Sequence, residues 1–291
     1  MSDIKIDAKM FQKPLHMEYN HPQEDAFRYQ VDEDSKTVIV VVADGITRDP
    51  IGATFLPTPT DPNYPKPSKA TEVANIFCES LVSFLRDSPP SLKSLNQAFV
   101  RANEEIRNPN RGIDIDYLKN DFAACVGVGG VIHENLLYYG YIGDCGLAVF
   151  DRKGTLQFQT KDEGPSKEIG KQARREGKKW SDPVWRAHVR KHYRNNPSEP
   201  LSYGAFTGEE TAMDFLRTGR YGIREGSTII FYTDGVLPFM NTKTFRITRR
   251  FRDLQDHVEK NKIRLNGAEG TFVTIFPYLN NEERQYARKR E

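Results

Sequence analysis

The chain has few cysteines, no long apolar run and little net charge. Its three cysteines, Cys78, Cys125 and Cys145, share no Cys-x-x-Cys spacing, which argues against a disulfide framework or a zinc site. No apolar run approaches the roughly 20 residues that a membrane-spanning helix needs. Residues 1–11 lack the apolar segment of a signal peptide. These absences predict a soluble protein of the reducing cytoplasm, with no membrane partner.

The formal charge is nearly balanced, with 42 Lys and Arg against 40 Asp and Glu, a net charge of +2. This balance does not favour a nucleic-acid or membrane-surface partner for the chain as a whole. The 17 Phe and 13 Tyr residues can supply a sizeable core in a chain of 291 residues. Because no internal repeat or clear linker divides the sequence, we expect a single domain over residues 1–291, and a monomer.

Strand-like and helix-like stretches come in blocks along the chain. Period-two or β-branched runs predict strands at 25–31, 37–43, 122–132, 136–143, 147–151, 155–159, 221–223, 228–232 and 271–278. Apolar residues at helical spacing predict helices that begin after the caps Ser68 and Ser91, and further helices near 166–175, 182–194 and 244–260. The stretch 47–67, rich in Pro, Thr and Asp, predicts a surface loop.

Antiparallel neighbours dominate this order of elements. The strands between residues 122 and 159 follow one another through short turns, as in a meander. Helices come in pairs between blocks of strands, and β-α-β crossovers are few. We therefore predict an α+β protein built from layered antiparallel sheets, rather than a doubly wound parallel sheet.

Two Asp-Gly pairs each follow a β-branched run that reads as a buried strand. Asp44-Gly45 follows residues 38–43, and Asp234-Gly235 follows residues 229–233. A carboxylate at the end of a buried strand is costly to desolvate unless something pairs with it. Two such acids in similar settings suggest one shared partner, and hard divalent cations prefer carboxylate, carbonyl and water oxygens.

Further acids stand at other strand ends. Glu24-Asp25 precedes a predicted strand, Asp144 lies in a tight turn between two strands, and Glu269 precedes the last strand. Any single Asp-Gly pair is more often an ordinary turn. The joint pattern instead fits a two-metal hydrolytic site, in which carboxylates hold ions about 3.5–4 Å apart and a water between them becomes the nucleophile.

The ordered motifs resemble the metal-dependent protein phosphatases, the type 2C serine/threonine phosphatases. They are Glu-Asp-Ala-Phe (24–27), Val-Ala-Asp-Gly (42–45), Gly-Asp-Cys-Gly (143–146), Tyr-Thr-Asp-Gly (232–235) and Glu-Gly-Thr-Phe-Val-Thr-Ile (269–275). The resemblance spans roughly residues 17–277. The stretch 202–208 looks like one found in bacterial-type members, so the chain is similar to a divergent, bacterial-like branch of the family.

This resemblance implies a four-layer α-β-β-α sandwich of two antiparallel sheets flanked by helix pairs, with two Mn²⁺ or Mg²⁺ ions at one edge. By position, Asp44 would bridge the two ions, and a hydroxide between the metals would attack phosphoserine or phosphothreonine. Asp44 and Asp234 are the expected catalytic residues. The implied ligands are Asp234 and Glu269 for one ion, Glu24 or Asp25 with the Gly45 carbonyl for the other, and Asp144 with Asp234 for a weaker third ion.

Three departures from the family pattern bear on activity. The last motif offers Ala268-Glu269 where the family has an acid one position earlier, Ile46 replaces a histidine read as a proton donor, and no arginine stands shortly before Glu24. They support a second hypothesis, in which the chain is a catalytically weak or inactive relative that acts as a binding or regulatory module.

A polar, basic insert at about residues 152–200 interleaves Lys and Arg with aromatic residues. It could grip an anionic phosphopeptide or nucleic acid, or it could be a solvated helical surface with its Trp side chains packed inward. Its place beside the predicted metals favours a substrate role. The candidate substrate-binding residues are Arg48, Arg186 and Arg190. His188 and His192 have the i, i+4 spacing of metal ligands but no carboxylate motif nearby, which argues against zinc.

The leading hypothesis is thus a phosphatase that acts on a phosphorylated protein. A third hypothesis, a scaffold that binds nucleic acid through its basic insert, is less favoured because the charge of the whole chain is balanced.

Overall fold

The computed structural model describes residues 4–12, 17, 20–46, 64–118, 120–165, 167–179, 182–237 and 269–276. Its strands form two five-stranded sheets, in the orders β1-β10-β9-β6-β7 and β2-β3-β4-β5-β8, and every ladder is antiparallel. The strands are β1 (Lys5–Phe11), β2 (Ala26–Asp32), β3 (Thr37–Gly45), β4 (Cys125–His133), β5 (Leu136–Ile142), β6 (Gly146–Phe150), β7 (Leu156–Gln159), β8 (Arg217–Gly222), β9 (Thr228–Tyr232) and β10 (Gly270–Phe276).

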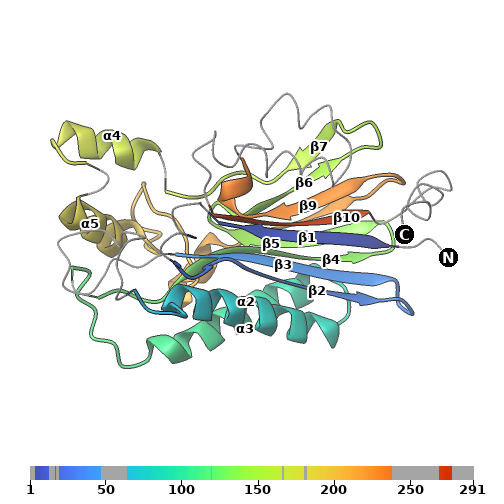
Figure 1. Ribbon diagram of the computed structural model, residues 1–291, viewed down its shortest axis with the longest axis horizontal. Coiled ribbons are helices and arrows are strands. Elements are labelled where there is room, and N and C mark those ends of the chain that lie inside the picture. The colour runs from blue at the N-terminus through green and yellow to red at the C-terminus, as the bar shows by residue number, and fades with distance from the viewer. Residues whose placement is uncertain are drawn as a thin grey trace.

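The two sheets pack face to face around an apolar core (Figure 1). Strand β3 shows why, because its side chains alternate between two buried layers. Val38, Val40 and Val42 point into the core between the sheets, whereas Ile39 and Val41 belong to the layer under the helices. A continuous β-branched run is what a strand covered on both faces requires.

Helices α2 (Lys69–Arg86) and α3 (Leu92–Asn110) cover the outer face of the β2-β3-β4-β5-β8 sheet (Figure 1). Both predicted caps are confirmed, because Ser68 accepts a hydrogen bond from the backbone N–H of Thr71 and Ser91 from that of Ser94. The α+β sandwich of antiparallel sheets is also confirmed. The helix expected near 244–260 lies outside the described residues, as do residues 47–63 of the loop expected at 47–67. No helix in the described ranges is long and apolar enough to cross a membrane.

The predicted meander is wrong in one respect, because the chain changes sheet at the turn after β5. Strand β5 pairs with β4 and β8, and β6 pairs with β7 and β9. Periodicity places a strand but does not reveal its neighbour, which is decided by packing. Strand β1 was not predicted, since its Lys and Asp residues obscure the alternation. The strand expected at 221–223 is the end of the longer β8.

Two further helices of the insert, α4 (Lys167–Arg175) and α5 (Pro183–Tyr193), lie beyond one end of the sheets (Figure 1), whereas its first part forms strand β7. They have a small core of their own, in which Ile169 and Ala173 of α4 pack against Trp185 and Val189 of α5. The two helices predicted near 166–175 and 182–194 are therefore confirmed. Two short 3₁₀ turns complete the described elements, η1 (Glu210–Phe215) and η2 (Asp234–Val236).

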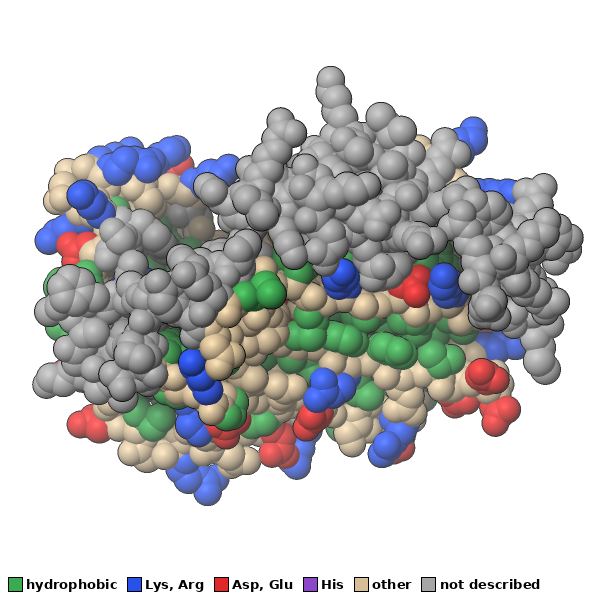
Figure 2. Space-filling model, viewed as in Figure 1, with side chains coloured by type: hydrophobic (Ala, Val, Ile, Leu, Met, Phe, Trp, Pro, Cys, Tyr) green, Lys and Arg blue, Asp and Glu red, His purple; other side chains and the backbone are tan. Residues whose placement is uncertain are grey.

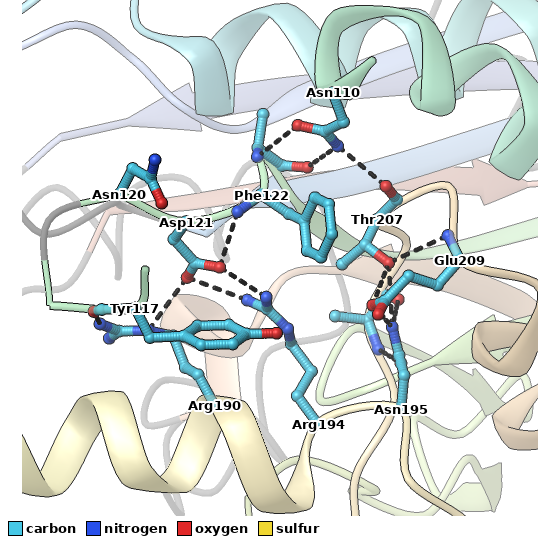
Figure 3. A network of polar contacts seen from close by, with 12 residues as sticks. Asn110, Tyr117, Asn120, Asp121, Phe122, Arg190, Arg194, Asn195, Thr207 and Glu209 are labelled. Carbon is cyan, nitrogen blue, oxygen red and sulfur yellow. Dashed lines mark hydrogen bonds and ion pairs between the residues drawn. The ribbon is translucent and has the colours of Figure 1, made fainter. Parts of the chain in front are cut away.

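Buried polar side chains connect the insert to the body of the protein (Figure 3). Asp121, just before β4, receives two hydrogen bonds from the guanidinium of Arg194, at 2.6 and 3.1 Å. The Asn195 side-chain amide donates to the Ala205 carbonyl and to Thr207 Oγ1, both at 3.0 Å. Because unmade hydrogen bonds inside a protein are costly, this network holds α5 in one position relative to β4.

At the end of α3, Asn110 connects the helix to two other segments. Its side-chain amide donates to the carbonyls of Ala123 and Thr207, and its side-chain oxygen accepts the N–H of Ala123, each at 2.8 Å (Figure 3). The Asn110 side chain is buried. Its removal leaves three backbone groups without a partner.

We expect Asn110→Ala to lower the free energy of unfolding by about 3 kcal/mol or more, because each of the three buried unsatisfied groups costs at least about 1 kcal/mol. Urea denaturation measures the change. The matched control is Asn108→Ala on the same helix, where the side chain is exposed and donates to the Glu105 carboxylate, and where the change should stay within about 0.5 kcal/mol. Equal losses in the two variants would contradict this description of the network.

Candidate active site

The acids singled out in the sequence gather at one end of the sandwich. This is the end at which β3, β5 and β9 finish and β2 and β10 begin, on the side of the insert helices (Figure 1). Asp44 is the next-to-last residue of β3, Asp144 lies in the turn from β5 to β6, and Asp234 opens η2 directly after β9. Antiparallel pairing thus brings together residues that are far apart in the sequence.

The glycine of each Asp-Gly pair lies where another segment of backbone comes very close. A Cβ atom on Gly45 would stand 2.6 Å from the carbonyl oxygen of Glu24 and 2.7 Å from that of Ala70. A Cβ atom on Gly235 would stand 1.9 Å from the carbonyl oxygen of Glu269. No side chain fits at such distances, so glycine lets the strand ends approach one another and keeps the carboxylates close.

Of the two acids before β2, Asp25 faces the other carboxylates and Glu24 is bonded elsewhere. The Glu24 carboxylate accepts hydrogen bonds from the Tyr64 hydroxyl at 2.6 Å and from the Ser68 hydroxyl. Asp25 accepts one from Thr233 Oγ1 at 3.0 Å, next to Asp234. Both acids are buried.

Glu269 contacts the same segment through its side chain. Its Oε1 accepts the backbone N–H of Glu24 at 2.6 Å and that of Asp25 at 3.4 Å. The carboxylate is thus placed against the chain just before β2, close enough to Asp25 to raise its pKa. Glu269 joins the group of acids, with one oxygen engaged by backbone amides.

Electrostatic repulsion among these carboxylates is strong. Burial, and after it the negative charges of Asp25 and Asp234, hold the pKa of Asp44 well above its usual range. Burial and Glu269 do the same to the pKa of Asp25. Burial and Asp234 raise the pKa of Asp144 to about 7. Within the described part of the chain, the charges that act most strongly on Asp25, Asp44 and Asp144 are all negative.

This donor set suits a hard divalent cation, because carboxylate oxygens and a backbone carbonyl are the ligands that Mg²⁺ and Mn²⁺ prefer. A cation among these groups would also remove the repulsion that raises their pKa values. As they stand, no three His, Cys, Asp or Glu side chains in the described ranges form a ready coordination sphere. The acids thus lie close enough to repel one another, but their carboxylates do not all point at a single metal position.

The site is open to solvent on one side. Asp234 is exposed, and Asp44 and Asp144 are half-buried. A small pocket borders Asp144 and is lined by Thr160, Asp162 and Tyr232, among others. The segment that leads to α4 forms part of this border, since the N–H of Glu163 donates to the Gly143 carbonyl at 3.0 Å.

The arginines predicted to bind substrate have different environments. Arg190 is buried, with its Nε 3.0 Å from Asp121 Oδ2 and its Nη2 donating to the Tyr117 carbonyl at 3.0 Å (Figure 3). A substrate-binding role requires an accessible guanidinium, whereas that of Arg190 is buried and contacts Asp121 and Tyr117. Arg186 is half-buried on α5, and its role stays a prediction. Arg48 lies outside the described residues.

Sequence reasoning missed the residues that hold the acids in place. Thr233 links three segments, because its hydroxyl donates to Asp25 and accepts the Thr271 N–H at 2.9 Å. Tyr64 and Ser68 fix Glu24 from the start of α2. A hydroxyl directly before Asp234 was a visible signal for Thr233. Nothing in the sequence pointed to Tyr64, which lies 40 residues from Glu24.

Solved structures share this fold at low sequence identity. The S. agalactiae serine/threonine phosphatase has a TM-score of 0.60 and 11% identity, over 94% of this chain and 98% of that chain. The catalytic domain of the serine threonine protein phosphatase PstP, in complex with 2 manganese ions, has a TM-score of 0.57 and 15% identity, over 94% and 96%. RsbX, in complex with magnesium, has a TM-score of 0.54 and 12% identity, over 94% of both chains.

Sequence comparison gives two results. No curated protein matches the chain. A family model described as protein phosphatase 2C matches residues 14–268. Because that match covers most of the 291 residues, the chain belongs to the protein phosphatase 2C family.

Proposed function

We propose that this protein is a metal-dependent phosphatase that hydrolyses phosphoserine and phosphothreonine in proteins. The observation that supports this most is the group of mutually repelling carboxylates at the strand ends, Asp25, Asp44, Asp144 and Asp234. Family membership supports this chemistry, and two relatives with the same fold are described with manganese or magnesium. The three cysteines are free and buried, in keeping with a reducing cytoplasm.

In this proposal different acids would coordinate each of two Mn²⁺ or Mg²⁺ ions. Asp44 would bridge them, Asp25 and the Gly45 carbonyl would serve one ion, and Asp234 and Glu269 the other. Asp144 would contribute to a third, weaker site. When bound, the ions supply charge neutralisation for the phosphoryl group and a water acidic enough to act as the nucleophile.

The chain's own groups position the acids and leave the site accessible. Thr233 orients Asp25 by its hydrogen bond, and the backbone amides before β2 orient Glu269. Asp234 is exposed, so a phosphorylated side chain could approach the site from solvent on this side. Ile46, which follows Gly45, carries no group that can donate a proton to the leaving serine or threonine.

One observation favours the alternative, a weakly active or inactive member that serves as a binding or regulatory module. An oxygen of Glu269 is engaged by two backbone amides, and Glu24 is engaged by Tyr64 and Ser68. Both carboxylates therefore make hydrogen bonds within the protein that would compete with the binding of a metal ion. Activity measurements separate the two functions.

We expect the protein to hydrolyse p-nitrophenyl phosphate and a phosphothreonine peptide with Mn²⁺, and to lose activity in EDTA. Asp44→Asn should lower kcat/KM by about 10³-fold, because metal ions contribute several kcal/mol of transition-state stabilisation and each 1.36 kcal/mol is a factor of ten. Released phosphate is the measurement. Turnover that does not depend on metal would contradict the proposal, and no turnover at all would favour the binding module.

The same substitution should stabilise the protein when no metal is present. Since burial, and after it repulsion by the neighbouring acids, raises the pKa of Asp44, its charged form opposes folding at neutral pH. Asp44→Asn should therefore raise the free energy of unfolding by about 1 kcal/mol or more in EDTA. The control is Asp151→Asn. The N–H groups of Thr155 and Lys153 stabilise Asp151 in its charged form, so this variant should not gain stability. Urea denaturation at pH 7.5 gives both values. A loss of stability in Asp44→Asn would argue against repulsion at this site.

A third comparison separates the two neighbouring acids before β2. We expect Asp25→Asn to weaken Mn²⁺ binding by about 100-fold or more and Glu24→Gln by only about tenfold, the lower end of the range for groups that only position a ligand. Isothermal titration calorimetry measures both affinities. The reverse order would identify Glu24 as the ligand and would mean that its bonds to Tyr64 and Ser68 break when the ion binds.

A further inference from the structure

Helix α4 presents a basic surface that the proposed reaction does not use. Lys167, Lys171, Arg174 and Arg175 follow the spacing i, i+4, i+7, i+8, which places them on one face of a helix. All four are exposed, and Lys178 and Lys179 extend the basic stretch beyond the helix. Figure 2 shows Lys and Arg side chains gathered over α4. We name these six residues the α4 basic face.

The opposite side of α4 fixes this face in place. Ile169 and Ala173 are buried against Trp185, Val189 and Tyr193. Helix α5 is in turn held to the body of the protein by the pair of Asp121 with Arg194. The basic face is therefore part of an ordered surface, rather than a loose cationic tail.

Most of its charge is not neutralised by the protein. Lys171 pairs with Glu168. Glu168 also attracts Arg175, but beyond ion-pair distance. Within the described ranges, Arg174 and Lys178 have no ion-pair partner. An uncompensated cluster of this kind attracts anionic partners and increases their rate of encounter.

The α4 basic face lies within reach of the site. Glu163 is hydrogen-bonded to the turn that carries Asp144, and Lys167 is only four positions further along the chain, so α4 begins within roughly 14 Å of Glu163. Arg175 is eight residues further along the helix, or about 12 Å at 1.5 Å per residue. An extended peptide covers the combined roughly 26 Å with about eight residues.

From this geometry we propose that the α4 basic face binds an acidic segment of the phosphoprotein substrate, with Asp or Glu residues about four to eight positions from the phosphorylated residue. The inference rests on the proposed phosphatase function and names its substrate class. Burial of Trp185 and Tyr193 argues against single-stranded nucleic acid, which uses exposed aromatic rings for stacking. Binding of an acidic polypeptide requires only the positive charges of the α4 basic face and their distance from the site.

Two phosphothreonine peptides of equal length test the proposal, one with four Glu residues at those positions and one with four Gln residues. For the wild-type protein at low salt, we expect kcat/KM to be about tenfold higher for the Glu peptide, and the ratio to fall toward one in 0.5 M salt. In Arg174→Gln/Arg175→Gln the ratio should be near one at low salt. The matched control, Arg220→Gln/Arg224→Gln, removes two exposed arginines from β8 and the turn after it and should keep the wild-type ratio.

A ratio near one in the wild-type protein, or an unchanged ratio in Arg174→Gln/Arg175→Gln, would overturn the proposal while leaving the phosphatase function intact. Fluorescence anisotropy with the unphosphorylated Glu peptide in EDTA gives a readout that does not depend on hydrolysis. Binding that weakens in Arg174→Gln/Arg175→Gln supports the docking surface even if no turnover is found. Tighter binding of a single-stranded RNA oligonucleotide of the same charge would overturn the choice of an acidic peptide.

Discussion

The main physical constraint on this structure is the repulsion between carboxylates that the fold brings together, which the rest of the protein must overcome. Asp25, Asp44 and Asp144 each have a raised pKa, because they are withdrawn from water and lie beside other acids. If these carboxylates bound nothing, bringing them together would lower the stability of the protein without serving a function. A bound cation converts the same repulsion into affinity, and this is why we take the strand ends to be a metal site.

The surrounding framework maintains this unfavourable arrangement. The glycines after Asp44 and Asp234 remove the side chains that would hold the strand ends apart. Thr233 connects the end of β9 to both Asp25 and the start of β10. The crossing from β5 to β6 carries Asp144 between the two sheets, to the same end of the sandwich. A β-sandwich has many buried contacts, and these contacts supply the stability that the acids remove.

Local patterns were enough to predict most elements of this fold. A hairpin pattern predicted β2, a continuous β-branched run predicted β3, and the caps Ser68 and Ser91 predicted the starts of α2 and α3. The order of acidic motifs indicated which carboxylates come together, and the structure brings Asp25, Asp44, Asp144, Asp234 and Glu269 into electrostatic contact. What failed depended on tertiary packing. Sequence could not reveal that β5 and β6 belong to different sheets, or that Arg190 turns inward to Asp121.

The central claim is that divalent cations bind between these strand ends. The most direct test is an anomalous difference map from a crystal of the protein grown with Mn²⁺. The account predicts strong peaks within coordination distance of Asp44, with Asp25 on one side and Asp234 on the other. The absence of peaks there, or peaks only elsewhere, such as beside His188 and His192, would contradict it.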